Sequence, residues 1–161
     1  MQMPFLNFCL ILFYGKPANG AFFVDAGFFT IFCDRDDAAL TFISLGKNVS
    51  INGDIDPNLY TTKHVDLLHN WPFARKSLAG IICVHFYHLP LIPYIISSLI
   101  DDGFFYFETI DNRGMNYLEL PRSSDNLREL LYTYFDVEIS SFTTHQNGRQ
   151  TIKYLGYKKT L

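Results

Sequence analysis

The stretch FLNFCLILFYGKPANGAFFVDAGFFTIFCDRD, residues 5–36, decides the fold. It begins with an apolar run at residues 5–13, passes through a glycine-containing turn and a helical stretch at 21–26, and ends with a second apolar run at 28–33. Runs that are apolar throughout are typical of strands covered on both faces. Two such strands joined by a helix predict a βαβ unit and a mainly parallel sheet.

The rest of the chain repeats this alternation of short apolar runs and amphipathic stretches. We expect further strands at residues 80–85 and 104–109, and a weaker third strand at either 49–51 or 64–67. Helices are expected where Asp, Pro or Ser residues precede amphipathic segments, at 36–45, 91–99 and 123–134. The stretch 46–62, rich in Asn, Asp, Gly and Thr, predicts a surface loop.

The C-terminal part has a different pattern. Two β-prone runs, at 137–143 and 151–158, flank Gln146-Asn147-Gly148, and an Asn-Gly turn between such runs indicates a hairpin. The predicted fold class is therefore α/β: a Rossmann-like, mainly parallel twisted sheet flanked by helices and ending in an antiparallel hairpin. At 161 residues we expect one domain, covering 1–161.

Charge and cysteine content narrow the class of protein. The net charge is −3, from 13 basic and 16 acidic residues without a basic run, so no nucleic-acid partner is expected. Cys9, Cys33 and Cys83 lie in apolar runs without metal-ligand spacing, which predicts buried thiols, no metal site and a reducing, cytoplasmic location. The apolar residues 1–14 lack signal-peptide features and are too short to span a bilayer, so no membrane association is expected.

Residues that follow the strands of a parallel sheet are the candidates for ligand binding. Gly15 follows the first strand, where backbone can approach a ligand, although an ordinary turn accounts for it equally well. Asp34, Asp36 and Asp37 follow the second strand, where a carboxylate can hold ribose hydroxyls or cap a helix. We assign Asp34 to binding and Asp36 or Asp37 to the helix.

The later strand ends carry further polar groups. Asp66 is placed to accept from an exocyclic amine, whereas core packing is the favoured reading of Trp71 nearby. His85 and Tyr87 follow the fourth strand, where a histidine can orient a substrate or take its proton, or serve structure alone. Glu108, in the fifth strand, needs a hydrogen-bonding partner, for which we expect Arg113 or a backbone N–H.

Taken together, these segments resemble the class I S-adenosylmethionine-dependent methyltransferases, especially the small bacterial tellurite-resistance and thiopurine types. The likeness follows the order of the family's motifs along nearly the whole chain. The matching segments are Gly15-Lys16-Pro17-Ala18-Asn19 (family G-x-G-R-N), Ala26-Gly27-Phe28 (RGF), Cys33-Asp34-Arg35-Asp36 (the acidic end of the second strand), residues 66–73 (DL…WPF), 102–109 (PGG…YET) and Asn116-Tyr117-Leu118 (NYL).

The resemblance implies S-adenosylmethionine as cofactor and a small molecule as methyl acceptor. The residues it places at the cofactor are Gly15, Asp34, Asp66 and Leu67, with Asp34 on the ribose and Asp66 on the adenine amine. The residues it places at the acceptor, as the catalytic set, are His85, Tyr87 and Asn116.

The chain departs from the family pattern at the first strand and turn. Ile11 stands where the family has an acid, and Pro17 and Ala18 stand where it has glycine and arginine. Proline offers no N–H and fixes φ, which opposes close approach of the backbone to a cofactor. A non-catalytic relative with a binding or structural role therefore stays open, whereas a nucleotide-dependent oxidoreductase needs a G-x-G-x-x-G turn that the sequence lacks.

Aromatic content is high, with 16 Phe and 10 Tyr residues. So many large apolar side chains in a small domain predict exposed apolar surface, which favours self-association. We therefore expect a homodimer.

Overall fold

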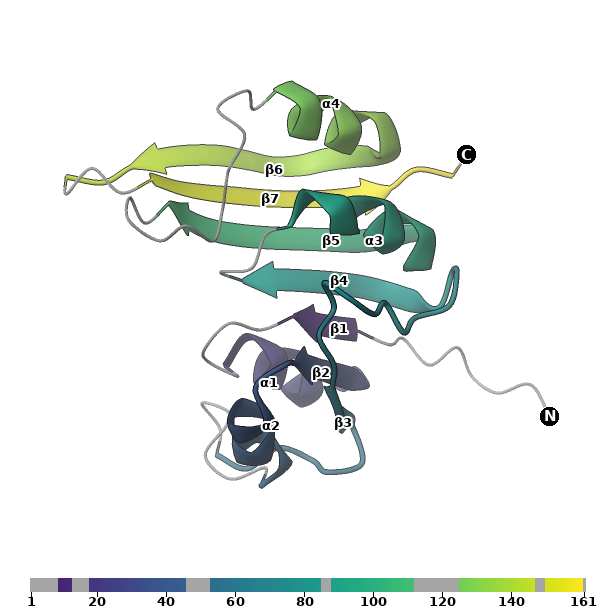
Figure 1. Cartoon of the computed structure of the whole chain (residues 1–161), viewed down its shortest axis with the longest axis vertical. Coiled ribbons are helices and arrows are strands. Elements are labelled where there is room, and N and C mark those ends of the chain that lie inside the picture. The colour runs from purple at the N-terminus through teal and green to yellow at the C-terminus, as the bar shows by residue number, and fades with distance from the viewer. Residues whose placement is uncertain are drawn as a thin grey trace.

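The computed structural model describes residues 9–12, 18–45, 53–84, 88–111, 125–146 and 150–160, which form one seven-stranded sheet with helices along it (Figure 1). The strands are β1 (Cys9–Leu12), β2 (Thr30–Asp34), β3 (Tyr60–His64), β4 (Leu78–Val84), β5 (Leu99–Asp111), β6 (Phe135–Thr144) and β7 (Gln150–Lys158). The helices are α1 (Ala18–Asp25), α2 (Asp37–Ser44), the short 3-10 helix η1 (Leu89–Leu91), α3 (Ile92–Ser98) and α4 (Asp125–Tyr134).

The strands lie in the order β3-β2-β1-β4-β5-β7-β6. Strands β1 to β5 pair in parallel, whereas β7 is antiparallel to both β5 and β6. This confirms the predicted mainly parallel sheet that ends in a hairpin. The sheet is mixed rather than wholly parallel because β7 inserts between β5 and β6, so that β6 forms the edge.

The third strand is where the sequence-based prediction was wrong. Strand β3 is Tyr60–His64, so the alternative at 64–67 shares only His64 with it, and the predicted loop at 46–62 already becomes strand at Tyr60. Residues 49–51, the other alternative, lie outside the described residues. Strand β3 is an edge strand that pairs with β2 alone and exposes much of its side-chain surface, so it lacks the apolar run by which the buried strands are found.

Two apolar cores lie on opposite faces of the sheet. On one face α1 and α2 pack on Phe32 of β2 and Ile82 of β4. On the other face α3 and α4 pack on β4, β5 and β7, around Ile81, Phe105 and Tyr154. Neighbouring residues of one strand, such as Ile81 and Ile82, therefore belong to different cores, which explains the continuous apolar runs.

The turn between α1 and β2 depends on a glycine. Gly27 has a φ of 87°, in the left-handed region, and its N–H donates to the carbonyl of Val24 at 2.9 Å. The N–H of Phe28 donates to the carbonyl of Phe23, also at 2.9 Å. These bonds satisfy the last carbonyls of α1 and turn the chain into β2, whose far end carries Asp34.

Candidate cofactor site

The carboxyl ends of the parallel strands meet at one edge of the sheet, and the strand order reverses there between β1 and β4. An open α/β sheet binds its ligands at such a reversal. Of the predicted site residues, Asp34, Asp66 and Leu67 lie at the neighbouring ends of β2 and β3. Gly15, His85, Tyr87 and Asn116 lie outside the described residues, so their roles stay predictions.

Asp34 is the last residue of β2, and its carboxylate is half-buried. Its Oδ1 accepts a hydrogen bond from the backbone N–H of Asp36 at 2.8 Å. Burial raises the pKa of the Asp34 carboxyl above its ordinary value, and the N–H groups of Asp36 and Arg35 act against that rise. An anion that is only partly compensated gains from a ligand that brings hydroxyl donors.

The neighbouring acid takes the capping role. Asp36 is the N-cap of α2, and its Oδ1 accepts from the backbone N–H of Ala38 at 2.9 Å. The prediction that Asp36 or Asp37 serves the helix is thus confirmed, because Asp36 caps α2. Asp34 is the last residue of β2.

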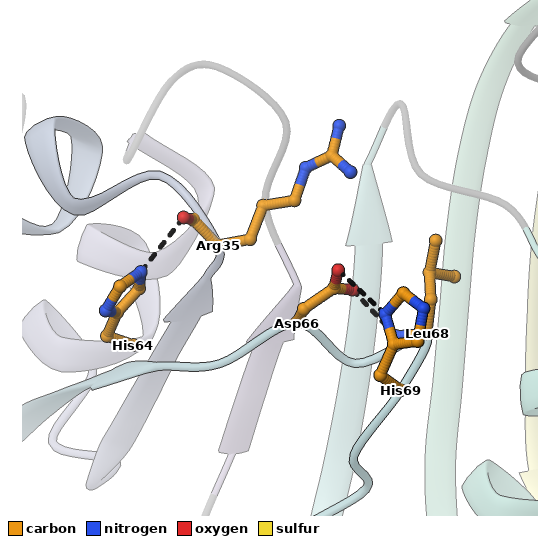
Figure 2. A network of polar contacts seen from close by, with 5 residues as sticks. All are labelled: Arg35, His64, Asp66, Leu68 and His69. Atoms are coloured by element: carbon orange, nitrogen blue, oxygen red, sulfur yellow. Dashed lines mark hydrogen bonds and ion pairs between the residues drawn. The ribbon is translucent and has the colours of Figure 1, made fainter.

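Asp66 lies two residues beyond the end of β3, in a turn that its own carboxylate closes. Its Oδ1 accepts from the backbone N–H of Leu68 at 3.0 Å, and its Oδ2 accepts from Nδ1–H of His69, also at 3.0 Å (Figure 2). These two hydrogen bonds hold the pKa of the Asp66 carboxyl below its ordinary value, and the bond from Leu68 has the larger effect. Asp66 is therefore an oriented anion at neutral pH and retains lone pairs for a further donor.

Backbone contacts join the two strand ends. Asp34 is the register partner of His64, and the N–H of Val65 donates to the Asp34 carbonyl at 2.9 Å. The Nε2–H of His64 donates to the carbonyl of Arg35 at 3.0 Å (Figure 2). The Arg35 side chain extends from there on the side of Asp66, whose carboxyl pKa it helps to lower. The two carboxylates are thus held on adjacent strand ends with a cation beside them.

Leu67 contributes its side chain to the core and not to the crevice. It is 7% exposed and packs in the cluster that contains Leu78 and Leu91. A ligand can therefore contact only the backbone atoms of Leu67.

Glu108 of β5 has partners that sequence reasoning missed. Its Oε2 accepts from the Tyr106 hydroxyl at 2.7 Å and lies 3.5 Å from Nζ of Lys153 on β7. The expected partners were Arg113, which lies outside the described residues, or a backbone N–H. The contact of Glu108 with Tyr106 could have been predicted from the sequence, since residues two apart in a strand share a face. The contact with Lys153 could not, because the position of Lys153 depends on the pairing of β7 with β5.

The structure confirms the expectations for Trp71 and for two of the cysteines. Trp71 is half-buried, packs on the core beside Phe73, and donates from Nε1 to Oγ of Ser98 at 2.8 Å, as the core or rim reading predicts. Cys33 and Cys83 are buried free thiols, also as predicted, whereas the Cys9 side chain lies outside the described residues.

No protein-family model and no curated protein sequence matches the chain. Solved structures do match. They include the N-methyltransferase NodS from Bradyrhizobium japonicum WM9, at 11% identity and a TM-score of 0.65 over 96% of this chain and 86% of NodS. A 16S rRNA adenine methyltransferase from Catenulisporales acidiphilia, solved with its cosubstrate S-adenosylmethionine, matches at 7% identity and a TM-score of 0.63 over 96% and 85%.

The chain has the class I methyltransferase fold. The cyclase SpnF shares this fold with the chain, at a TM-score of 0.71 and 7% identity over 96% of this chain and 75% of SpnF. One fold thus carries N-methylation, rRNA methylation and a cyclisation in these neighbours, so the reaction has to be argued from the site.

Two negative findings concern the part of this methyltransferase fold that the structure describes. Within it, no three His, Cys, Asp or Glu side chains lie close enough together to hold a metal ion. No helix within it is long and apolar enough to cross a membrane.

Proposed function

We propose that the chain is an S-adenosylmethionine-dependent methyltransferase that acts on a small molecule. The observation that carries the proposal is the pair of carboxylates, Asp34 and Asp66, on adjacent strand ends of a class I methyltransferase sheet. An adenosine group presents two ribose hydroxyls and an exocyclic amine. These groups donate hydrogen bonds, which two separate carboxylates can accept.

In this proposal each residue has a defined task. Asp34 accepts from the ribose hydroxyls, and its half-buried carboxylate gains further donors beside the N–H of Asp36. Asp66 accepts from the adenine amine while its bond from the backbone N–H of Leu68 keeps it in place. The backbone at Leu67 lies beside the adenine edge. Bound S-adenosylmethionine supplies an activated methyl group on a sulfonium, so the protein's main work is to align the acceptor and exclude water.

The acceptor side rests on residues outside the described part of the chain. We assign His85, Tyr87 and Asn116 to it, as the resemblance implies. A small-molecule acceptor is supported by the net charge of −3 and the absence of a basic run in the sequence, which disfavour RNA. The free thiols Cys33 and Cys83 fit a reducing compartment, and we place the protein in the cytoplasm.

A non-catalytic role is the second candidate, and specific residues favour it. Pro17 and Ala18 replace glycine and arginine of the family turn, and Ile11 replaces an acid. In the described part, His69 already occupies Oδ2 of Asp66. A chain with these changes can keep the fold while it loses cofactor affinity.

Calorimetric titration with S-adenosylmethionine and with S-adenosylhomocysteine tests the proposal, with the thermal midpoint followed in parallel. Saturable binding of both compounds in the micromolar range, with a rise of the midpoint, is the expected result. Absence of binding at millimolar ligand overturns the cofactor assignment and leaves the non-catalytic role.

A further inference from the structure

His69 contacts the same carboxylate to which the adenine amine is assigned. Its Nδ1 lies 3.0 Å from Oδ2 of Asp66, three residues earlier in the turn (Figure 2). The other oxygen of that carboxylate, Oδ1, accepts from the backbone N–H of Leu68, also at 3.0 Å. His69 therefore adds a second donor to a carboxylate that the backbone already orients.

The imidazole of His69 is open to solvent. Its side chain is 82% exposed, whereas that of Asp66 is 35% exposed. Histidine is the side chain whose charge ordinarily changes between about pH 5 and about pH 8. An exposed imidazole exchanges its proton with water directly and can turn away from Asp66 without any change in the fold.

The charge of the His69 ring decides how firmly it holds Asp66. Both nitrogens of an imidazolium carry hydrogen, so the protonated ring always has a donor at Nδ1, and its positive charge strengthens the bond to a carboxylate. A neutral ring carries one hydrogen, on Nδ1 or on Nε2. The form with hydrogen on Nε2 presents a lone pair at Nδ1 and makes no bond to a carboxylate. Loss of the proton therefore loosens the contact on Oδ2.

The other charged groups near Asp66 do not take the place of His69. The charge of Arg35 helps to lower the pKa of the Asp66 carboxyl. His64 lies on the opposite side of Asp66 from His69 in Figure 2, with its Nε2 on the carbonyl of Arg35. Within the described part of the chain, no ion pair joins Asp66 to Arg35, to His64 or to the other titratable groups of the adjoining elements, which are Asp34 on β2, Asp36 and Asp37 at the start of α2, and Lys63 on β3.

We propose that His69 is a pH-dependent autoinhibitory contact: the protonated ring competes with the adenine amine for Asp66, so that cofactor affinity falls as the medium becomes more acidic. This inference rests on the proposed function, because it takes Asp66 as the acceptor of the adenine amine. The carboxylate keeps lone pairs beside those that Leu68 and His69 use, so the competition weakens cofactor binding without abolishing it. A contact between exposed groups changes the affinity about two- to fivefold.

The direction of the pH effect follows from linkage. Since the ligand competes with the protonated ring, the complex favours neutral His69, and binding releases a fraction of a proton. Affinity therefore rises with pH over the range in which His69 loses its proton. Asp34 adds an effect of the same sign, because burial raises the pKa of its carboxyl and ribose hydroxyls favour the anion. A test has to separate His69 from Asp34.

Calorimetric titration of the full chain with S-adenosylhomocysteine between about pH 5 and about pH 8 makes this separation. Across this range the affinity of the wild type should rise about two- to fivefold more than that of His69→Ala, which keeps the contribution of Asp34. His69→Asn offers an amide N–H that does not titrate, so its affinity should change with pH as that of His69→Ala does.

The matched control is a second exposed histidine. His145 follows β6, at the opposite edge of the sheet from β3, and its Nε2 contacts the Thr151 hydroxyl. His145→Ala should keep the pH profile of the wild type. Far-UV circular dichroism at each pH confirms that the variants are folded.

A change in the ligand gives a second test that needs no variant. An analogue of S-adenosylhomocysteine with hydrogen in place of the exocyclic amine lacks the donor that competes with His69 but keeps the ribose assigned to Asp34. The wild type should bind this analogue with the pH profile that His69→Ala shows for S-adenosylhomocysteine.

The outcomes separate this inference from the proposed function. Binding of S-adenosylhomocysteine with equal pH profiles for the wild type and His69→Ala overturns the role of His69 and leaves the proposed function in place. A profile for the analogue that matches the wild-type profile for S-adenosylhomocysteine overturns it as well. Absence of binding to either protein at every pH overturns the proposed function, and the role of His69 with it.

Discussion

Asp34 and His64 end two neighbouring parallel strands in direct register. Because the chain leaves both strands at the same edge, the carboxylate of Asp34 and that of Asp66, two residues after His64, lie on adjacent strand ends. The first three predictions test this pair.

Asp34→Asn should lower the affinity for S-adenosylmethionine at least about tenfold, as expected where a charged hydrogen-bond partner is lost. The amide keeps an oxygen that can accept from the N–H of Asp36, so the turn is retained. Calorimetry on the variant and the wild type measures the effect. Asp36→Ala is the matched control: loss of the N-cap should cost about 1 kcal/mol of stability with cofactor affinity unchanged. Equal affinities of Asp34→Asn and wild type would refute the ribose assignment.

The same substitution has a consequence for pH. Since burial raises the pKa of Asp34 in the folded protein, its contribution to the free energy of unfolding is present in full below the unfolded pKa of about 3.9. That contribution is lost as pH rises through the folded pKa. The ligand-free Asp34→Asn variant should therefore gain stability over the wild type as pH rises from about 4 toward neutrality. Urea unfolding at several pH values measures the difference, and a constant difference contradicts the prediction.

Asp66→Asn should lower the affinity for S-adenosylmethionine and for S-adenosylhomocysteine by the same factor, because the two compounds share the adenine that Asp66 is proposed to hold. His69→Ala is its counterpart. It removes the donor on Oδ2 but leaves the bond from Leu68, and it should raise affinity for both compounds about twofold, the size of an exposed pair. Parallel titrations distinguish the outcomes. Weakening by His69→Ala would mean that His69 itself contacts the ligand or orients Asp66 for it.

Gly80→Ala should destabilise the fold. A Cβ at Gly80 would overlap the Phe104 ring, which lies over this position of β4 and stacks on Phe23 of α1. The expected loss is about 1–3 kcal/mol in the free energy of unfolding, the range for overpacking. Urea denaturation measures it. Adding Phe104→Leu should recover part of the loss, and two effects that simply add would exclude the overlap as the cause.

Cys33 and Cys83 should resist thiol reagents while the protein is folded. Burial raises the pKa of Cys33 to about 12 and raises the pKa of Cys83 as well, so neither forms the reactive thiolate at pH 8. Labelling with a maleimide, followed by peptide mapping, should show both thiols unmodified in buffer and modified in denaturant. Rapid labelling of either thiol in the folded protein would indicate that its strand opens.

Local patterns were sufficient for much of this protein. The apolar runs of β2 and β4, the antiparallel pairing of β6 with β7 and the place of Asp34 at a strand tip follow from side-chain periodicity and turn chemistry, which act between residues close in sequence. The helix-capping role of an Asp after β2 was predictable for the same reason, since Asp36 and Ala38 are two residues apart.

Only the tertiary structure decided the rest. The polar strand β3 is recognisable through its pairing with β2, and not through an apolar run of its own. The insertion of β7 between β5 and β6 sets Lys153 beside Glu108. These features depend on strand pairing between segments far apart in the chain, whose free energy comes from burying shared apolar surface rather than from the preference of any short segment.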